Sequence, residues 1–164
     1  MIRQLSETDF QTIYAIVNDA AVAYKGKIPA DCWREPYMPK EELRQEINSG
    51  VQFYGYIQNG KVVVVMGIQR VGDITLVRHA YTLTSCQRQG LGEKLLKHLL
   101  SLVETDLVLV GTWEAASWAI RFYQKNGFKL LCRKETNKQL KTYWNIPERQ
   151  IETSVVLKQK RQPK

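Results

Sequence analysis

The first hydrophobic positions of the chain recur at helical spacing. Ser6 or Thr8 is placed to cap this segment, and Gly26 follows its last apolar residue. The pattern predicts an amphipathic first helix, followed by an irregular stretch over 27–39 and a short helix over 40–48. The apolar positions of the first helix are Phe10, Ile13, Tyr14, Val17, Ala20, Ala21 and Tyr24.

Three strand patterns come next. Residues 51–56 are rich in aromatic and β-branched side chains, and Asn59-Gly60 separates them from the apolar run 62–68. Gly72-Asp73 marks a second turn before the segment 74–83. The sequence therefore predicts an antiparallel meander of three strands ahead of the next helix.

The period changes again in the second half. A glycine-containing loop leads into a helix whose apolar face holds Leu91, Leu95, Leu99 and Leu102. A short apolar strand over 107–110, a helix over 115–123 and strands over 129–133 and 151–157 follow, the last two flanking a long polar connection. This order predicts an α+β fold with a mixed sheet.

Length and composition favour one soluble domain. The chain has 164 residues and is 44% hydrophobic, enough for a sizeable core. We predict a single domain over 1–158 and a basic flexible tail over 159–164. No apolar run approaches the roughly 18 residues of a membrane span, and no secretory signal pattern starts the chain, so we expect a cytoplasmic protein without membrane partners.

Cysteine, histidine and charge narrow the possible partners. Three cysteines and two histidines without close pairing favour neither a disulfide framework nor a metal site, so no metal is expected. The net charge of +8 is inflated by basic residues near the C-terminus. The remaining charge would attract a phosphate-bearing cofactor as readily as nucleic acid, and we rank nucleic-acid binding lower.

The most informative segment is Gln87-Arg88-Gln89-Gly90-Leu91-Gly92, which lies between a predicted strand and a predicted helix. Glycines let the backbone approach a ligand closely, and the N–H groups that start a helix attract anions. A Walker loop would need Gly-Lys-Ser/Thr, and a dinucleotide fingerprint would need a third glycine where Leu95 stands. By itself the pattern leaves two interpretations, a phosphate loop or a tight strand-to-helix turn.

Context favours the phosphate loop. Gln87, Gly90 and Gly92 match the acetyl-CoA loop Gln/Arg-x-x-Gly-x-Gly/Ala of the GNAT superfamily of N-acetyltransferases, which this sequence resembles. Downstream, the segment from Ala119 through Tyr123 to Gly127-Phe128 resembles the family's Ala-x-x-x-Tyr-x-x-x-Gly-Phe motif. The resemblance spans 74–128 and implies a GNAT-like fold, with a mixed, mostly antiparallel sheet flanked by helices on both faces.

The resemblance also implies a donor site. Backbone N–H groups from Arg88 to Glu93 would hold the CoA pyrophosphate, and the main chain of Ala80, Tyr81 and Thr82 would pair with pantetheine. The full set of implied cofactor-binding residues is Ala80, Tyr81, Thr82, Gln87, Arg88, Gln89, Gly90, Leu91, Gly92 and Glu93. One departure is Ala116, which stands where many members have an asparagine that bonds the cofactor.

Tyr123 is the implied general acid, because family members place a tyrosine there to protonate the departing thiolate. Its other interpretation is core packing beside Phe122. An amine acceptor also needs a base, since alkyl amines titrate near about pKa 10. Glu114 and His79 are the candidates, and neither follows from a motif. Cys86 has no partners at the spacing of a nucleophile, so direct attack is expected.

The acceptor is the least determined feature. We expect its specificity to lie in Lys25–Pro39 and Thr136–Arg149, which carry aromatic and charged residues. Such segments could line a small-molecule pocket, grip a peptide or form a homodimer interface. The sequence thus predicts an acetyl-CoA-dependent N-acetyltransferase acting on a small-molecule or protein amine. The alternative is an inactive CoA-binding sensor or interaction module.

Overall fold

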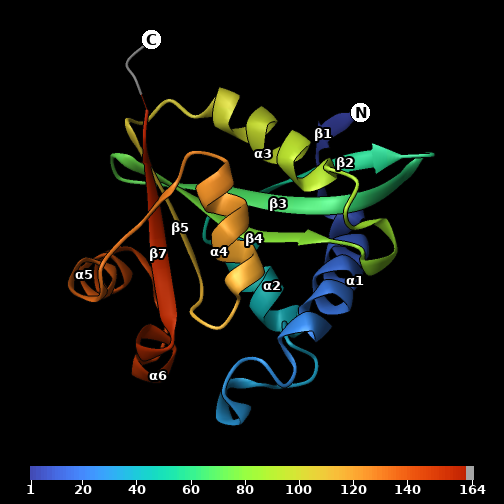
Figure 1. Cartoon of the computed structure of the whole chain (residues 1–164). Helices are drawn as coiled ribbons and strands as arrows, with labels where there is room; N and C mark the ends of the chain where they lie inside the picture. Colours follow the sequence, from blue (N-terminus) through green and yellow to red (C-terminus); the bar gives the residue numbers. More distant parts are fainter. Residues whose placement is uncertain (162–164) are drawn as a thin grey trace. The chain divides into compact units, whose positions relative to one another are not determined.

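A computed structural model describes residues 1–161 and contains a mostly antiparallel sheet with α-helices (Figure 1). The strands are β1 (Ile2–Gln4), β2 (Gln52–Gln58), β3 (Lys61–Val71), β4 (Ile74–Thr82), β5 (Leu107–Trp113), β6 (Lys129–Leu130) and β7 (Ser154–Lys160). The α-helices are α1 (Phe10–Ala21), α2 (Lys40–Asn48), α3 (Leu91–Leu102), α4 (Ser117–Lys125), α5 (Arg133–Tyr143) and α6 (Glu148–Glu152). Short 3₁₀ turns include η4 (Thr84–Cys86).

The strands follow the order β1-β2-β3-β4-β5-β7-β6. The pairs β1–β2, β2–β3, β5–β7 and β6–β7 are antiparallel. The meander over β2, β3 and β4 is present as the sequence predicts, and the α+β class is confirmed. The chain divides into two compact units, and β4 is shared between them: residues 77–82 belong to the first unit and residues 74–76 to the second. The two units are described in turn.

The first unit comprises 1–23, 34–70 and 77–104. Its core forms where the apolar stripe of α1 and Leu43 of α2 meet β2 and β3. The buried members are Leu5, Phe10, Ile13, Ile16, Val17, Met38, Leu43, Val51, Phe53 and Val65. The apolar side chains of α1, which recur with a period of about 3.6 residues, therefore face this core. Burial of this apolar face stabilises the segment as a helix.

Alternation along β2 places helices on both faces of this part of the sheet. Phe53 is buried in the core with α1 and α2. Its neighbour Tyr54 lies against His98 of α3, with ring centroids 6.3 Å apart, and Lys94 of α3 lies over the ring of Tyr56. Successive side chains of a strand point to opposite faces, so the two helix layers follow from the sequence of β2.

The second unit comprises 24–33, 71–76 and 105–161 of the described chain. Its core packs β5 and β7 against α5 and α6. The buried members are Ile74, Leu76, Leu109, Leu140, Ile151 and Val156. Thr75 and Thr105 satisfy one another inside the unit through hydroxyls 2.7 Å apart. Polar groups that are buried together in this way avoid the cost of an unpaired hydroxyl.

Several sequence predictions need correction in the C-terminal region. The predicted strand over 129–133 is only β6, and the polar connection contains α5. Residues 151 and 152 belong to α6, so the last strand begins at Ser154. Only Thr136 and Leu140 of α5 are buried, which is too thin an apolar stripe to reveal a helix.

Both ends of the chain also differ from expectation. The sequence analysis missed β1, a three-residue strand that pairs with β2. Gln159 and Lys160, which fall in the predicted tail, are part of β7, because their backbone pairs with Val108 and Leu107 of β5. Residues 162–164 of that predicted tail lie outside the described residues. No helix within residues 1–161 has the length and apolar character of a membrane-crossing one.

Candidate acetyl-CoA site

The glycine loop joins β4 to α3 in the first unit. After η4 the chain extends through Gln87, and Arg88 and Gly90 then take left-handed backbone conformations, with φ of 64° and 74°. Gly90 is the residue that precedes the first helical turn of α3. Glycine adopts the left-handed conformation with less strain than other residues, so the glycine that the motif supplies suits this position.

The start of α3 presents backbone donors. The N–H of Lys94 bonds the carbonyl of Gly90 at 3.2 Å, which is the i to i−4 bond that opens the helix. The N–H groups of residues 91–93 precede that bond and point toward the helix N-terminus, where the macrodipole favours an anion. Arg88 is exposed beside them. The loop therefore fits a phosphate group chemically.

Side-chain hydrogen bonds hold the loop in place. Gln87 donates its amide to the carbonyl of Thr82 at 3.2 Å, and Gln58 donates to the amide oxygen of Gln89 at 3.2 Å. Asp19 of α1 accepts from the backbone N–H and the hydroxyl of Thr84, at 2.8 and 3.0 Å. The two glutamines thus bind protein groups, and Asp19 is an anchor that sequence analysis missed, because it lies 65 residues from its partner.

The other predicted donor residues divide by exposure. Ala80, Tyr81 and Thr82 are half-buried at the end of β4, and Gly92 and Glu93 are half-buried in the first turn of α3. Leu91 is only 5% exposed, so its side chain belongs to the core and only its backbone can face a ligand. The structure thus places one predicted strand segment and one predicted loop in the same unit.

His79, a candidate base, has a left-handed backbone within β4, with φ of 55°. Its Nε2 lies 3.7 Å from a carboxylate oxygen of Glu46 on α2. The same carboxylate is 2.8 Å from the guanidinium of Arg78. Sequence analysis missed Glu46 and Arg78, because 32 residues separate them and only the fold brings them together.

Tyr123, the predicted general acid, is in the second unit on α4. It is 5% exposed and makes edge-on ring contacts with Phe122 and Phe128, at centroid distances of 5.1 and 5.6 Å. Burial raises the pKa of its hydroxyl well above the usual value of 10, and Tyr24 adds to this rise. The hydroxyl therefore stays protonated over the working pH range. Core packing and proton donation are both compatible with this placement.

The remaining candidates in the second unit differ in their surroundings. Ala116 is fully buried at the start of α4. Its methyl group cannot make the hydrogen bond of the family's asparagine. The Glu114 side chain is 64% exposed and lies 3.7 Å from Arg133. Solvent-exposed carboxylates are in general weak bases near neutral pH. Within residues 1–161, no three His, Cys, Asp or Glu side chains gather as metal ligands would.

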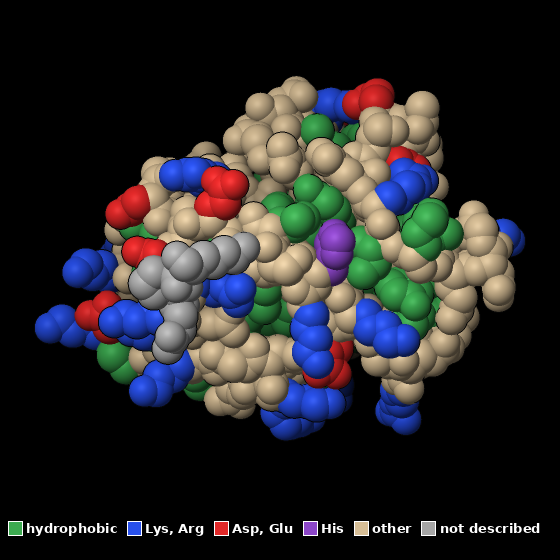
Figure 2. All heavy atoms as spheres, turned by 90° about the horizontal axis from the view of Figure 1, so that it is seen from above, with side chains coloured by type: hydrophobic (Ala, Val, Ile, Leu, Met, Phe, Trp, Pro, Cys, Tyr) green, Lys and Arg blue, Asp and Glu red, His purple; other side chains and the backbone are tan. Residues whose placement is uncertain are grey.

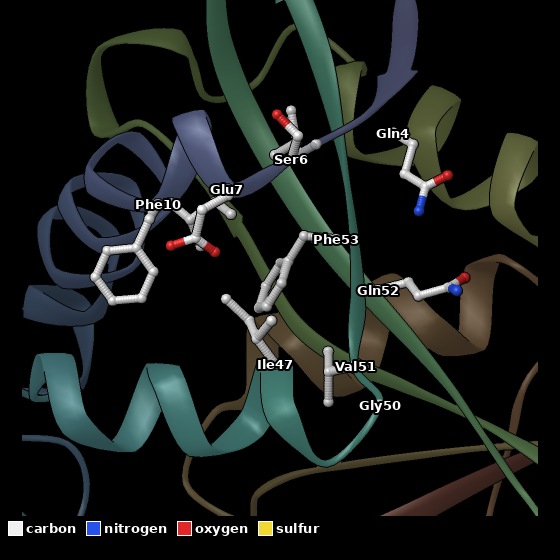
Figure 3. A pocket seen from close by; sticks show the side chains of 11 residues that line it. Gln4, Ser6, Glu7, Phe10, Ile47, Gly50, Val51, Gln52 and Phe53 are labelled. Carbon is white, nitrogen blue, oxygen red and sulfur yellow. The ribbon is translucent and has the colours of Figure 1, made fainter.

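A hollow of about 300 Å³ lies in the first unit beside α1, α2 and β2 (Figure 3). In this view, the side chains of Ile47 and Phe53 point toward one another, whereas those of Gln4 and Gln52 extend to the other side. Phe10, Ile47, Phe53, Gln4 and Gln52 all belong to the lining. Its lining also includes Leu5, Ser6, Glu7, Ile13, Gly50 and Val51. Because it does not include any residue of the glycine loop, it is a feature separate from the predicted donor site.

Basic side chains are spread over the surface seen in Figure 2, with acidic ones among them and several hydrophobic groups exposed near the middle. The net charge of the chain is +8. Near the glycine loop, Lys97 pairs with Glu93 at 3.2 Å, one helical turn apart. A net positive charge raises the local concentration of anionic ligands in general.

Solved structures that are similar over 98% of this chain include the following three acetyltransferases. The PaiA N-acetyltransferase of Thermoplasma acidophilum, in complex with coenzyme A, has 18% identity, a TM-score of 0.72 and 98% of its own chain covered. The ribosomal-protein-S18-alanine N-acetyltransferase of Escherichia coli has 20% identity, a TM-score of 0.67 and 92% of its own chain covered. A GNAT family acetyltransferase of Elizabethkingia anophelis, with acetyl-CoA bound, has 19% identity, a TM-score of 0.64 and 97% of its own chain covered.

At these identities the structural matches establish a common fold. No curated protein sequence matches the chain. The model of the acetyltransferase (GNAT) domain family matches residues 13–142, which include the glycine loop and the Tyr123 motif. This chain therefore belongs to the GNAT acetyltransferase family.

Proposed function

We propose that this protein transfers an acetyl group from acetyl-CoA to an amine by direct attack. The observation that carries the proposal is the loop at Gly90, whose left-handed backbone and helix start fit a pyrophosphate. Family membership supports it. So do the structures of the Thermoplasma acidophilum and Elizabethkingia anophelis relatives, which contain coenzyme A and acetyl-CoA.

Donor binding is assigned to the loop and to β4. The backbone N–H groups from Arg88 to Glu93 bind the pyrophosphate, and Arg88 contributes charge. The main chain of Ala80, Tyr81 and Thr82 pairs with pantetheine. Gln87 and Gln89 act indirectly, since their amides hold the loop through Thr82 and Gln58.

Proton transfer on the donor side is assigned to Tyr123. Attack by an amine on the thioester expels a thiolate, which must be protonated before it can re-add. A buried phenol is protonated at neutral pH, so it has a proton to give. Because the raised pKa makes it a weaker acid, the proton transfer has to accompany cleavage of the carbon–sulfur bond. The edge-on contacts with Phe122 and Phe128 fix the ring, so the hydroxyl does not need to be reoriented.

On the acceptor side, the surroundings of His79 suit a base better than those of Glu114. His79 is largely buried and lies beside a carboxylate, whereas Glu114 is mostly exposed and lies near a cation.

We favour a small-molecule amine as acceptor over a protein amine. In the second unit, Asp31 accepts from Arg149 of α6 at 2.8 and 3.2 Å, which links the two segments, 25–39 and 136–149, expected to set specificity.

The test is release of free thiol from acetyl-CoA in the presence of a panel of amines and peptides, with mass spectrometry of the products. Acetylated product that depends on both substrates supports the proposal. The alternative is a CoA-binding sensor without turnover, and the buried Ala116 is the observation that favours it, because a donor contact of the family is missing. Binding of acetyl-CoA without thiol release from any amine would favour the sensor.

A further inference from the structure

Arg78 and His79 are successive residues of β4, and both face Glu46 of α2. Regular strand residues alternate between the two faces of a sheet. The left-handed backbone of His79, with φ of 55°, breaks this alternation. As a result the carboxylate of Glu46 lies 2.8 Å from Arg78 and 3.7 Å from Nε2 of His79.

The surroundings of this cluster shield it from solvent. The side chains of Arg78 and His79 are 15% exposed and that of Glu46 is 18% exposed. Phe53 of β2 stacks on His79 with centroids 6.0 Å apart, and Gln69 of β3 accepts a hydrogen bond from Arg78 at 3.2 Å. Nε2 of His79 is buried and, within residues 1–161, has no hydrogen-bond partner. The exposed part of the ring is therefore away from Nε2.

Two charged groups, the carboxylate of Glu46 and the guanidinium of Arg78, lie beside His79. Burial alone would raise the pKa of Glu46, but the neighbouring His79 and the cation of Arg78 together lower it, so the carboxylate is ionised. Burial lowers the pKa of Arg78, while Glu46 and Glu42 of α2 oppose that effect. An arginine remains a cation in proteins. An ionised carboxylate thus faces the buried nitrogen of the imidazole.

We propose that Glu46 is a positioning residue that makes His79 the proton acceptor for the incoming amine. This inference rests on the acetyltransferase function proposed above. With the neutral ring's proton on Nε2, toward Glu46, the lone pair of Nδ1 points elsewhere and is free to act. An ammonium acceptor gives one proton to Nδ1, which leaves its own nitrogen lone pair for attack on the thioester.

The resulting imidazolium is stabilised by the carboxylate that its Nε2–H faces. His79 then returns this proton from Nδ1 to water. The second nitrogen proton leaves as the tetrahedral intermediate collapses, and it balances the proton that the departing thiolate takes up, so one proton is released in each cycle. Arg78 acts one step further away, because it orients the carboxylate of Glu46. Gln69 accepts a hydrogen bond from Arg78 and so helps to hold the guanidinium in place. Glu46 itself does not touch either substrate in this scheme.

The test compares the pH dependence of kcat/KM in the wild type, Glu46→Gln and Glu41→Gln. Glu41 lies on the same helix and is exposed, so it is the matched loss of charge. With Glu46→Gln we expect the acid limb of the profile to move to lower pH, because an opposite charge no longer favours the imidazolium. We also expect kcat to fall with little change in acetyl-CoA affinity. Glu41→Gln should match the wild type in all three.

Glu46→Gln leaves Arg78 without its carboxylate, so folding must be checked by thermal melting. Glu46→Asp keeps the charge and should recover the position of the acid limb. A double-mutant cycle adds a second criterion: in a His79→Gln background, Glu46→Gln should cause no further shift of the profile. An equal shift in both backgrounds would overturn the proposal, since the carboxylate would then act without His79.

A ligand-free experiment separates this inference from the function it rests on. The ring proton signals of the two histidines can be followed against pH by NMR, with His98→Gln identifying His79. Glu46→Gln should move the His79 titration and leave that of His98 in place. If His79 responds but no amine is acetylated, the acetyltransferase proposal fails and the base role fails with it. If amines are acetylated with an unshifted profile in Glu46→Gln, the positioning role alone is refuted.

Discussion

Replacing Gly90 by alanine tests the loop most sharply. The residue has φ of 74°, and a Cβ added there would meet no atom of the described chain within 4 Å beyond its immediate neighbours. The cost to the free protein is therefore backbone strain alone, about 1–2 kcal/mol for an L-residue in the left-handed region. For a chain of this size, each kcal/mol lowers Tm by roughly 2–4 °C. We expect Gly90→Ala to melt roughly 2–8 °C below the wild type.

Gly60 provides the matched control. It lies in the turn between β2 and β3 with φ of 76°, and its Cβ would also enter open space. Gly60→Ala should lose the same stability. Only Gly90→Ala should weaken acetyl-CoA binding, because strain and the added methyl act where the backbone approaches the pyrophosphate. We expect Kd to rise at least about tenfold, which corresponds to about 1.4 kcal/mol.

Calorimetric titration with acetyl-CoA and thermal melting without ligand measure the two effects separately. The titration is performed well below the melting transition of each variant, so that all three proteins are folded. Equal affinity in the wild type, Gly60→Ala and Gly90→Ala would refute the assignment of the loop. It would return Gly90 to the simpler interpretation of a tight strand-to-helix turn.

Three further predictions concern catalysis, acid stability and packing. Tyr123→Phe keeps the ring contacts and should lower kcat about 100-fold or more in the thiol-release assay, with unchanged acetyl-CoA affinity; a wild-type rate would mean that solvent protonates the thiolate. Asp9 has a pKa lowered from 3.8 to about 2, chiefly by the hydrogen bond from Arg3. The ionised carboxylate therefore stabilises the fold at pH values above its unfolded pKa, and this stabilisation is lost as the pH falls through about 2. Urea unfolding should show Asp9→Asn about 1–2 kcal/mol less stable at neutral pH, with the gap closing near pH 2; a gap independent of pH would contradict this. Gly67→Ala would place a Cβ 2.7 Å from a methyl of Val51, so it should cost about 1–3 kcal/mol in the same assay, and a wild-type midpoint would show that the core can relax.

The elements with a clear apolar period were predictable from the sequence. The short helix α2 and the meander appear where the pattern places them, and so does the stripe of α1 as far as Ala21. The predicted last position, Tyr24, falls in a 3₁₀ turn over 22–24. The helix α5 was not predictable, because its mean character is polar and only Thr136 and Leu140 are buried. The strand β1 is too short for an alternating pattern to be visible in the sequence, and its pairing with β2 is a contact between segments that are distant in the sequence.

The candidate site shows the same division. Two local motifs pointed to the glycine loop and to Tyr123, and the family match over 13–142 includes both. Contacts between distant segments left no such signal. Asp19 holds Thr84, and Glu46 faces His79, only because α1 and α2 pack on the sheet in the first unit. The sequence could name His79 as a candidate base but could not supply its carboxylate partner.

The most direct test of the central claim is mass-spectrometric detection of an acetylated amine after incubation with acetyl-CoA, alongside calorimetric titration with acetyl-CoA and free CoA. The account predicts micromolar binding of acetyl-CoA and a product whose mass rises by one acetyl group, formed only when donor, amine and protein are all present. Absence of binding by both acetyl-CoA and free CoA would contradict the account at its foundation.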